Sequence, residues 1–144
     1  MSIHSRTRLI IHLIWSTYKR KAIVEGALRK RLHKFLHEYS ERKEFGYITS
    51  YVNADHVHYM VDISPTKSIS DLVKQIKGAS SRWLNQQDDQ WSKFNWGRGY
   101  AAFSVSESKV KQVIDYINNQ KVHHAKHSFQ EEIDLFQKKY RIEN

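Results

Sequence analysis

The chain has 144 residues, of which 40% are hydrophobic and 27% charged, with five glycines, one proline and no cysteine. This length fits one compact unit with a sizeable core, so we predict a single domain over residues 1–144. The absence of cysteine excludes disulfides and thiolate metal sites. No apolar stretch approaches the roughly 20 residues that a membrane helix needs. Arg6 and Arg8 interrupt the apolar run near the N-terminus, so we expect no signal peptide and a cytoplasmic location.

The charge balance indicates the class of partner. Lysine and arginine together number 24 against 15 aspartates and glutamates, which gives a net charge of +9. Such an excess favours a polyanion, because each neutralised phosphate releases a condensed counterion. The chain also has 4 Trp, 8 Tyr and 6 Phe, and aromatic rings beside cations suit unstacked bases. Many basic proteins bind nucleic acid only incidentally, so charge alone predicts a nucleic-acid partner and no mechanism.

The spacing of apolar residues predicts the secondary structure along the chain. The expected elements are a strand at 9–16, a helix at 25–44, strands at 47–52 and 57–63, a helix from Ser68 or Ser70 to about residue 86, a strand at 99–105, a helix from Ser106 or Ser108 to about residue 124, and a short helix at 131–140. The order β-α-β-β-α-β followed by helix predicts an α+β fold, a ferredoxin-like or RRM-like sandwich with an antiparallel sheet. Two helices would cover one face of the sheet and leave the other face open.

A histidine pair on the third predicted strand is the most pointed chemical feature. Alternate side chains of a strand share a face, about 7 Å apart, so His56 and His58 would lie side by side on the open face. Two neutral imidazoles at this separation can converge on one small cation. Asp55, at the turn before the strand, could orient a histidine from behind, and His12 on the first strand could border the site. Two solvated histidines, and a structural role for His12, are the alternative interpretations.

The last long predicted helix carries Tyr116 and Gln120 one turn apart, on the flank of its apolar stripe. Lys109 and His123 follow the same flank. A phenol, an amide and imidazoles arranged in this way could cover a reactive phosphate. The alternative is a tyrosine that packs at the helix edge with its hydroxyl in water.

Two further segments carry candidate contacts to DNA. The helix after the histidine strand presents four polar side chains as candidate phosphate contacts, namely Lys74, Lys77, Ser81 and Arg82. Residues 94–100 interleave aromatic side chains and glycines with Arg98, as a base-stacking site would. A solvated helix face and a cap on the core are the competing interpretations of these two segments.

Taken together, these motifs resemble the single-tyrosine HUH transposases of small bacterial insertion sequences and their relatives associated with repeated extragenic palindromes. Residues 55–58 (Asp-His-Val-His) resemble the histidine-hydrophobic-histidine motif of that family, and residues 70–82 resemble the segment that follows it. Residues 96–100 (Trp-Gly-Arg-Gly-Tyr) and 116–120 (Tyr-Ile-Asn-Asn-Gln) resemble the stretch before the last strand and the catalytic helix. The resemblance runs from about residue 8 to 127, whereas residues 128–144, a terminal helix or tail, match nothing in it.

The resemblance implies a metal-dependent transposase that cleaves and rejoins single-stranded DNA. Tyr116 would be the nucleophile and form a covalent 5′-phosphotyrosine. It would lie on a catalytic helix that is added to the fold at its C-terminal end. Mg²⁺ or Mn²⁺ would be held by His56, His58 and, by family analogy, Gln120. The resemblance further implies hairpin recognition at the element ends by a homodimer whose subunits share their active sites. The candidate DNA contacts are then Lys74, Lys77, Ser81, Arg82, Arg98 and Lys109. His123 is a candidate group for orienting a metal-binding histidine.

Three other functions fit the same sequence. A domesticated relative would cleave chromosomal palindromes without a mobile element. A binding module would engage single-stranded nucleic acid without cutting it. A metal-dependent nuclease would use water in place of Tyr116 and would leave no protein attached to its product.

Overall fold

The fold is an antiparallel sheet between two layers of helices, as seen in a computed structural model that describes residues 5–88, 93–120 and 129–142. The strands are β1 (Ile10–Ser16), β2 (Tyr47–Val52), β3 (His56–Asp62) and β4 (Ala101–Ser104), in the spatial order β2-β3-β1-β4. The helices are α1 (Gly26–Arg42), α2 (Ile69–Asn85), α3 (Val110–Asn118) and α5 (Phe129–Ile142), with short 3-10 turns η1 (Tyr18–Arg20) and η2 (Glu107–Lys109). This order and pairing confirm the predicted ferredoxin-like sandwich.

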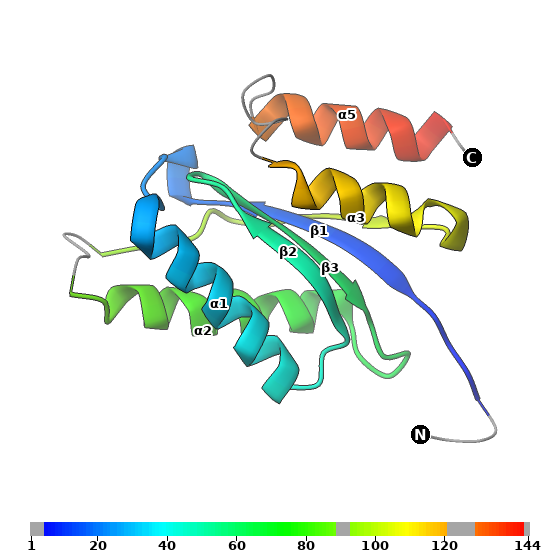
Figure 1. The fold of residues 1–144 in the computed structure, drawn as a ribbon, viewed down its shortest axis with the longest axis horizontal. Coiled ribbons are helices and arrows are strands. Elements are labelled where there is room, and N and C mark those ends of the chain that lie inside the picture. The colour runs from blue at the N-terminus through cyan, green and yellow to red at the C-terminus, as the bar shows by residue number, and fades with distance from the viewer. Residues whose placement is uncertain (1–4, 89–92, 121–128, 143–144) are drawn as a thin grey trace.

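The main core lies between the sheet and the pair α1 and α2 (Figure 1). The alternation of β3 decides which side chains reach this core, because successive residues point to opposite faces. Val57, Tyr59 and Val61 pack into it, whereas Met60 belongs to a smaller cluster on the other face. His56 and His58 share the Met60 face, so the predicted direction of the histidines is confirmed.

The expectation of an open sheet face is wrong. Figure 1 shows α3 and α5 lying across the face opposite to α1 and α2. The apolar side chains of α3 that cover it are Val110, Val113 and Ile117, which pack with Ile10 and Met60 of the sheet. His12, His56 and His58 are consequently 0% exposed. The sequence indicates that α5 is amphipathic. It does not indicate which surface the apolar side of α5 packs against, so the covering of this sheet face could not be predicted.

Local signals set the ends of several elements. Ser68 caps α2, since its Oγ accepts from the backbone N–H of Asp71 at 3.1 Å. Gly46 ends the connection after α1 with φ +87°, and a Cβ there would lie 2.1 Å from the carbonyl oxygen of Asp62. The predicted helix from Ser106 or Ser108 begins as η2 and continues as α3, and its expected end near residue 124 lies outside the described residues. The strand predicted at 99–105 is shorter, because Gly99 and Tyr100 lie outside β4.

No helix in the described ranges is both long enough and apolar enough to cross a membrane.

Candidate functional site

The site is built around the two histidines at the start of β3. A tight turn precedes them, in which the backbone N–H of Asn53 donates to the carbonyl of His56 at 2.8 Å. The turn therefore fixes His56 as the first residue of the strand and places His58 beside it, with ring centroids 5.2 Å apart. The structure thus brings the two imidazoles side by side, in a buried setting between β3, α3 and α5.

A third group, Glu132 of α5, meets both imidazoles. Its Oε2 atom lies 2.6 Å from Nε2 of His58 and 3.4 Å from Nε2 of His56. Glu132 is 0% exposed, and one ligand atom from each of these three residues lies within 4.8 Å of the other two. Glu132 was not among the site residues predicted from the sequence. The signal was its place on an otherwise apolar stripe, between Phe129 and Phe136 at helical spacing.

The rear nitrogen of each imidazole is also held. The Nδ1 atom of His56 donates to Oδ1 of Asp55 at 2.7 Å, and Nδ1 of His58 lies 2.9 Å from Nε2 of buried His12. Both contacts orient the rings so that their Nε2 atoms face Glu132. Asp55 and His12 therefore lie where the sequence placed orienting groups, whereas His123 falls outside the described residues.

The charges of this cluster are strongly coupled. Burial raises the pKa of Glu132, but hydrogen bonds from His56 and His58 outweigh it and bring the pKa to about 2. Burial lowers the pKa of His56, yet its bonds to Asp55 and Glu132 leave that pKa above its ordinary value. Burial, reinforced by the neighbouring His58, lowers the pKa of His12 well below its ordinary value. His12 is therefore neutral at pH 7, whereas Glu132 is a buried carboxylate that stabilises protonated His56.

Tyr116 on α3 lies next to this cluster. Its ring centroid is 6.1 Å from that of His58 and 4.9 Å from that of Phe136 on α5. Burial, with the negative charge of Glu132 as the next cause, raises the pKa of Tyr116 to about 12. Its side chain is half-buried, but Oη itself is buried. The phenol is therefore protonated and enclosed in this arrangement.

Gln120 is buried against the same cluster. Its Oε1 accepts from Nδ2 of Asn53 at 3.2 Å, and that Nδ2 lies 3.1 Å from Nε2 of His56. Its Nε2 donates to the backbone carbonyl of Tyr116 at 3.3 Å. The structure thus brings Tyr116, Gln120 and both histidines together. The spacing of Tyr116 and Gln120 predicted only that these two side chains lie one helical turn apart, not that they lie beside the histidines.

The donor set fits a divalent metal ion. Two imidazole nitrogens and a carboxylate oxygen suit Mn²⁺ and, with phosphate or water oxygens added, Mg²⁺. Oε1 of Glu132 is a buried oxygen without a hydrogen-bond partner among the described residues. A buried carboxylate oxygen without a donor is costly, and a cation removes that cost. The residues present therefore match the metal that the resemblance implies.

The four predicted phosphate contacts on α2 lie on the opposite side of the sheet from the histidines. Lys77 donates from Nζ to the carbonyls of Gly97 and Gly99, at 2.7 and 2.9 Å, and so holds the loop before β4. Lys74 and Arg82 line a shallow pocket of about 380 Å³, and Ser81 donates to the carbonyl of Gly78 at 3.3 Å. These side chains do not contact the histidine cluster, so any phosphate they bind lies on a separate surface.

Arg98 and Lys109 lie on the side of the sheet that carries the cluster. Arg98 lines a pocket of about 250 Å³ with Arg20, Tyr100 and Phe129. The ring of Phe129 lies 5.1 Å from that of His56, so this pocket adjoins the cluster. Lys109 ends η2 and precedes α3, the helix that carries Tyr116.

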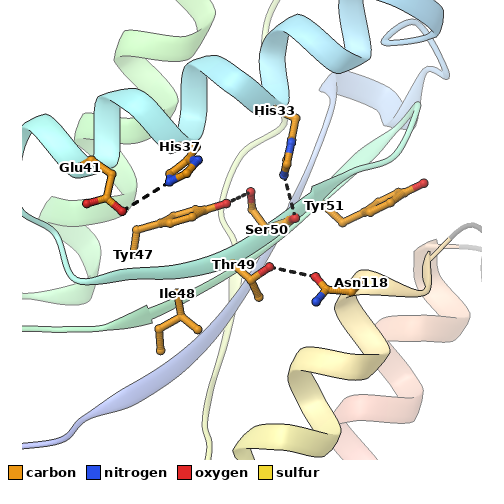
Figure 2. A pocket seen from close by; sticks show the side chains of 9 residues that line it. All are labelled: His33, His37, Glu41, Tyr47, Ile48, Thr49, Ser50, Tyr51 and Asn118. Carbon is orange, nitrogen blue, oxygen red and sulfur yellow. Dashed lines mark hydrogen bonds and ion pairs between the residues drawn. The ribbon is translucent and has the colours of Figure 1, made fainter.

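Another pocket, of about 510 Å³, lies at the free edge of β2 (Figure 2). It is lined by α1, by β2 and by Asn118 of α3. His33 of α1 donates to the carbonyl of Ser50 at 3.1 Å, and Arg29 donates to that of Val52 at 3.4 Å. Burial lowers the pKa of His33, which keeps it a neutral donor at pH 7. These bonds cover the outward carbonyls of an edge strand and hinder pairing with another chain.

Comparisons with known proteins identify the relatives of this chain. The sequence model of the family described as Transposase IS200 like matches residues 5–120. The chain is 30% identical over 118 residues to the ISDra2 transposase TnpA of Deinococcus radiodurans, which covers 78% of this chain and 84% of that protein. It is 29% identical over 122 residues to the transposase for insertion sequence element IS200 of Salmonella typhimurium, with 81% and 80% covered.

Two solved structures share the fold. A crystal structure of a Deinococcus radiodurans protein assigned as a transposase has a TM-score of 0.63 and 28% identity, over 83% of this chain and 96% of that chain. The structure of a REP-associated tyrosine transposase bound to a REP hairpin has a TM-score of 0.61 and 14% identity, over 86% of this chain and 74% of that chain. The second likeness concerns the fold alone.

Proposed function

This chain belongs to the IS200-like transposase family, and on that premise we propose that it cleaves and rejoins single-stranded DNA at the ends of an insertion sequence through a covalent bond to Tyr116. The observation that carries the proposal is the enclosure of Tyr116 beside His56 and His58, whose Nε2 atoms converge on one point. A phenol next to a metal-binding group supports nucleophilic attack on a phosphate.

A divalent metal, Mg²⁺ or Mn²⁺, would be held by His56 and His58, with Gln120 as the third ligand that the family resemblance implies. When bound, the ion supplies Lewis-acid polarisation of the scissile phosphate. Asp55 and His12 hold the rear nitrogens of the two imidazoles and so keep the Nε2 atoms available to the ion.

Tyr116 performs the transfer in this proposal. Its Oη atom attacks the scissile phosphorus, the bond from phosphorus to the 3′ oxygen breaks, and the strand leaves with a free 3′-hydroxyl. The phenolic proton leaves as the new bond forms, and the departing 3′ oxygen takes up one proton, so the step is neutral in protons overall; a pKa of about 12 opposes the loss of the phenolic proton at neutral pH. The negative charge of Glu132 contributes to that high pKa, so neutralising this carboxylate favours the phenolate. Because the phosphotyrosine conserves the phosphodiester bond energy, rejoining needs no nucleotide cofactor.

Access to Tyr116 requires a movement of α5. The ring of Phe136 stands edge-on against Tyr116 and also against His12, at centroid distances of 4.9 and 4.7 Å. Tyr116 Oη is buried in this arrangement, so a DNA strand cannot approach it in line. We therefore propose that α5 shifts when DNA binds.

The proposed substrate is single-stranded DNA that carries hairpins at the element ends. The net charge of +9 supports a polyanionic partner, and a structural relative has been solved with a REP hairpin bound. Arg98, close to the cluster, and Lys109, before the Tyr116 helix, are the nearest candidate contacts to the cleaved strand. The family resemblance also implies a homodimer in which each subunit completes the other's site.

The test is covalent capture of DNA. The protein is incubated with Mn²⁺ and labelled single-stranded oligonucleotides that cover the flanks of its own gene, beside Tyr116→Phe and His56→Ala. The proposal expects a labelled band that migrates with the protein and is absent from both variants. Cleavage that persists in Tyr116→Phe would establish a water-using nuclease instead. Binding with neither adduct nor cleavage, on oligonucleotides containing the hairpin, would leave a binding module.

A further inference from the structure

We propose that the pocket at the free edge of β2 (Figure 2) binds an unpaired guanine base of the DNA strand that Tyr116 cleaves. This inference rests on the proposed function and adds a base-specific contact to it. It gives a role to a surface formed by α1, β2 and the end of α3, which the cleavage chemistry does not use.

The pocket has the size and the lining of a site for one nucleoside. Its volume of about 510 Å³ lies within the range of about 300–1,000 Å³ that is usual for small-molecule sites. On its α1 side, the imidazole of His37 stacks on the ring of Tyr47, with centroids 4.8 Å apart and planes 20° from parallel. The His37 side chain remains 53% exposed, so a base can stack on it and extend the pair.

A carboxylate beside this stack selects among the bases. Oε1 of Glu41 lies 3.4 Å from Nε2 of His37, and the Glu41 side chain is 63% exposed. An ionised carboxylate only accepts hydrogen bonds and has about four acceptor sites, so it can keep His37 and take two donors from a base. Guanine is the base whose Watson–Crick edge offers two adjacent donors, N1–H and the N2 amine, whereas adenine, cytosine and thymine each offer one donor group there. Glu41 therefore fits guanine, and its negative charge disfavours a phosphate in the same place.

The pocket adjoins the proposed cleavage site. Tyr51 of β2 is paired directly with His58 of β3, so the two side chains share a face, with Cβ atoms about 4.5–5.5 Å apart. Asn118, two residues after Tyr116 on α3, lines the same pocket and accepts from Oγ of Thr49 at 2.9 Å. A base in the pocket and a phosphate beside Tyr116 can therefore belong to one strand.

Arg29 of α1 supplies positive charge between the pocket and the cleavage site. Its guanidinium lies over the ring of Tyr51, 5.4 Å from the centroid, and donates to the carbonyl of Val52 at 3.4 Å. A guanidinium has five N–H donors, so Arg29 can keep this bond and still contact a phosphate. The phosphate that joins the bound base to the rest of the strand would then contact Arg29.

A peptide strand fits this edge less well than a base does. Addition of a strand to a sheet needs free backbone groups along the edge. Here the carbonyl of Ser50 accepts from His33, and the carbonyl of Val52 accepts from Arg29. A base contacts the side chains of the pocket and leaves both bonds in place. The net charge of +9 also favours a nucleic acid over a protein partner.

The test measures which base the full chain prefers, by fluorescence anisotropy with a chelator present, so that no cleavage interferes. The probes are short thymidine strands with one central guanine, adenine or hypoxanthine, a base that keeps N1–H but lacks the N2 amine. The guanine strand should bind about fivefold or more tightly than the adenine strand, the low end of what a bidentate base contact discriminates, with hypoxanthine between them. Glu41→Gln should remove most of this preference. Glu38→Gln, which removes another exposed carboxylate of α1, is the matched control and should keep the preference.

A second readout locates the base. The same strand with thioguanine at its centre is irradiated, and mass spectrometry should find the crosslink on residues of α1 or β2 that line the pocket. An equal affinity for guanine and adenine, a preference that Glu41→Gln leaves intact, or a crosslink outside the pocket would overturn the inference. A guanine preference that meets these criteria, in a protein that forms no DNA adduct with Mn²⁺, would support the base site while the proposed cleavage fails, which is a different outcome.

Discussion

Removal of Glu132 should loosen α5 in the metal-free protein, by an amount that follows from the structure. A fall of its pKa from the ordinary 4.5 to about 2 corresponds to about 3 kcal/mol, at about 1.4 kcal/mol for each pH unit. Breaking a buried ion pair by deleting one partner costs about 3–5 kcal/mol, which agrees in size. We therefore expect Glu132→Ala to lower the free energy of opening α5 by about 3 kcal/mol near pH 6.

The pH dependence follows from the two pKa shifts. The pKa of Glu132 is lower in the folded protein, so its contribution is present above its ordinary pKa of 4.5 and is lost as the pH falls towards 2. The pKa of His56 is raised in the folded protein, so its contribution is present below about pH 6.5 and is lost as the pH rises through the folded value. The effect of Glu132→Ala should thus be largest between these limits and smaller at pH 9.

Amide exchange in α5 is the direct assay, because a terminal helix can open without global unfolding. The experiment is run with a chelator at pH 6 and pH 9, and Gln137→Ala on the exposed face of α5 is the control. A control effect within about 0.5 kcal/mol is expected for such a surface position. If Glu132→Ala changes α5 opening no more than the control, or equally at both pH values, Glu132 is not held by protonated imidazole.

Three further substitutions test separate parts of the structure. Asp55→Asn should weaken Mn²⁺ binding by about 10–100-fold, measured by calorimetry, because it removes the carboxylate that orients His56; unchanged affinity would contradict that role. Lys77→Met should lower the free energy of unfolding in urea by about 1–3 kcal/mol, since two bonds from a half-buried ammonium to the loop before β4 are lost. A loss of DNA affinity without loss of stability would instead favour a phosphate contact. Gly46→Ala should cost more than about 2 kcal/mol in thermal unfolding, because its Cβ would clash with the Asp62 carbonyl at a positive φ; a neutral result would show that the turn can relax.

Much of the fold could be predicted because its signals are local. The two-residue period of β3 assigns Val57 and Tyr59 to one face and His56 and His58 to the other, whatever covers each face. The tight turn before His56 and the cap at Ser68 depend on a few neighbouring residues. The element order then limits the topology to few choices, and the ferredoxin-like arrangement is among them.

The parts of the fold and of the site that could not be predicted depend on contacts between segments distant in the sequence. Glu132 lies 74 residues after His58, and nothing within α5 specifies where its apolar stripe docks. Lys77 was expected to meet phosphate because it lies on a polar helix face, yet the loop that it holds follows 20 residues later. A charged residue on an apolar stripe, as Glu132 is, was the one local sign that a buried partner exists.

The position of α5 also bears on the order of events in cleavage. Phe136 of α5 covers Tyr116, so α5 must release the phenol before a DNA strand can reach it. Arg20 ties the start of α5 to η1, through a 2.8 Å bond to Gln130 and a contact with the ring of Phe129. The chain has no cysteine, so Arg20→Cys with Gln130→Cys accepts one cleavable bis-maleimide at this junction.

Such a link should separate metal binding from chemistry. With α5 held in place, the protein should still bind Mn²⁺, because His56 and His58 keep their places on β3, but it should form no DNA adduct, because Tyr116 Oη stays buried. Cleaving the linker should restore adduct formation to the level of the unlinked double variant. The unlinked double variant is the control, because it also lacks the Arg20 contacts. Adduct formation at an equal rate in the linked protein would mean that α5 remains docked during attack, so the strand would have to reach Tyr116 from the α3 side.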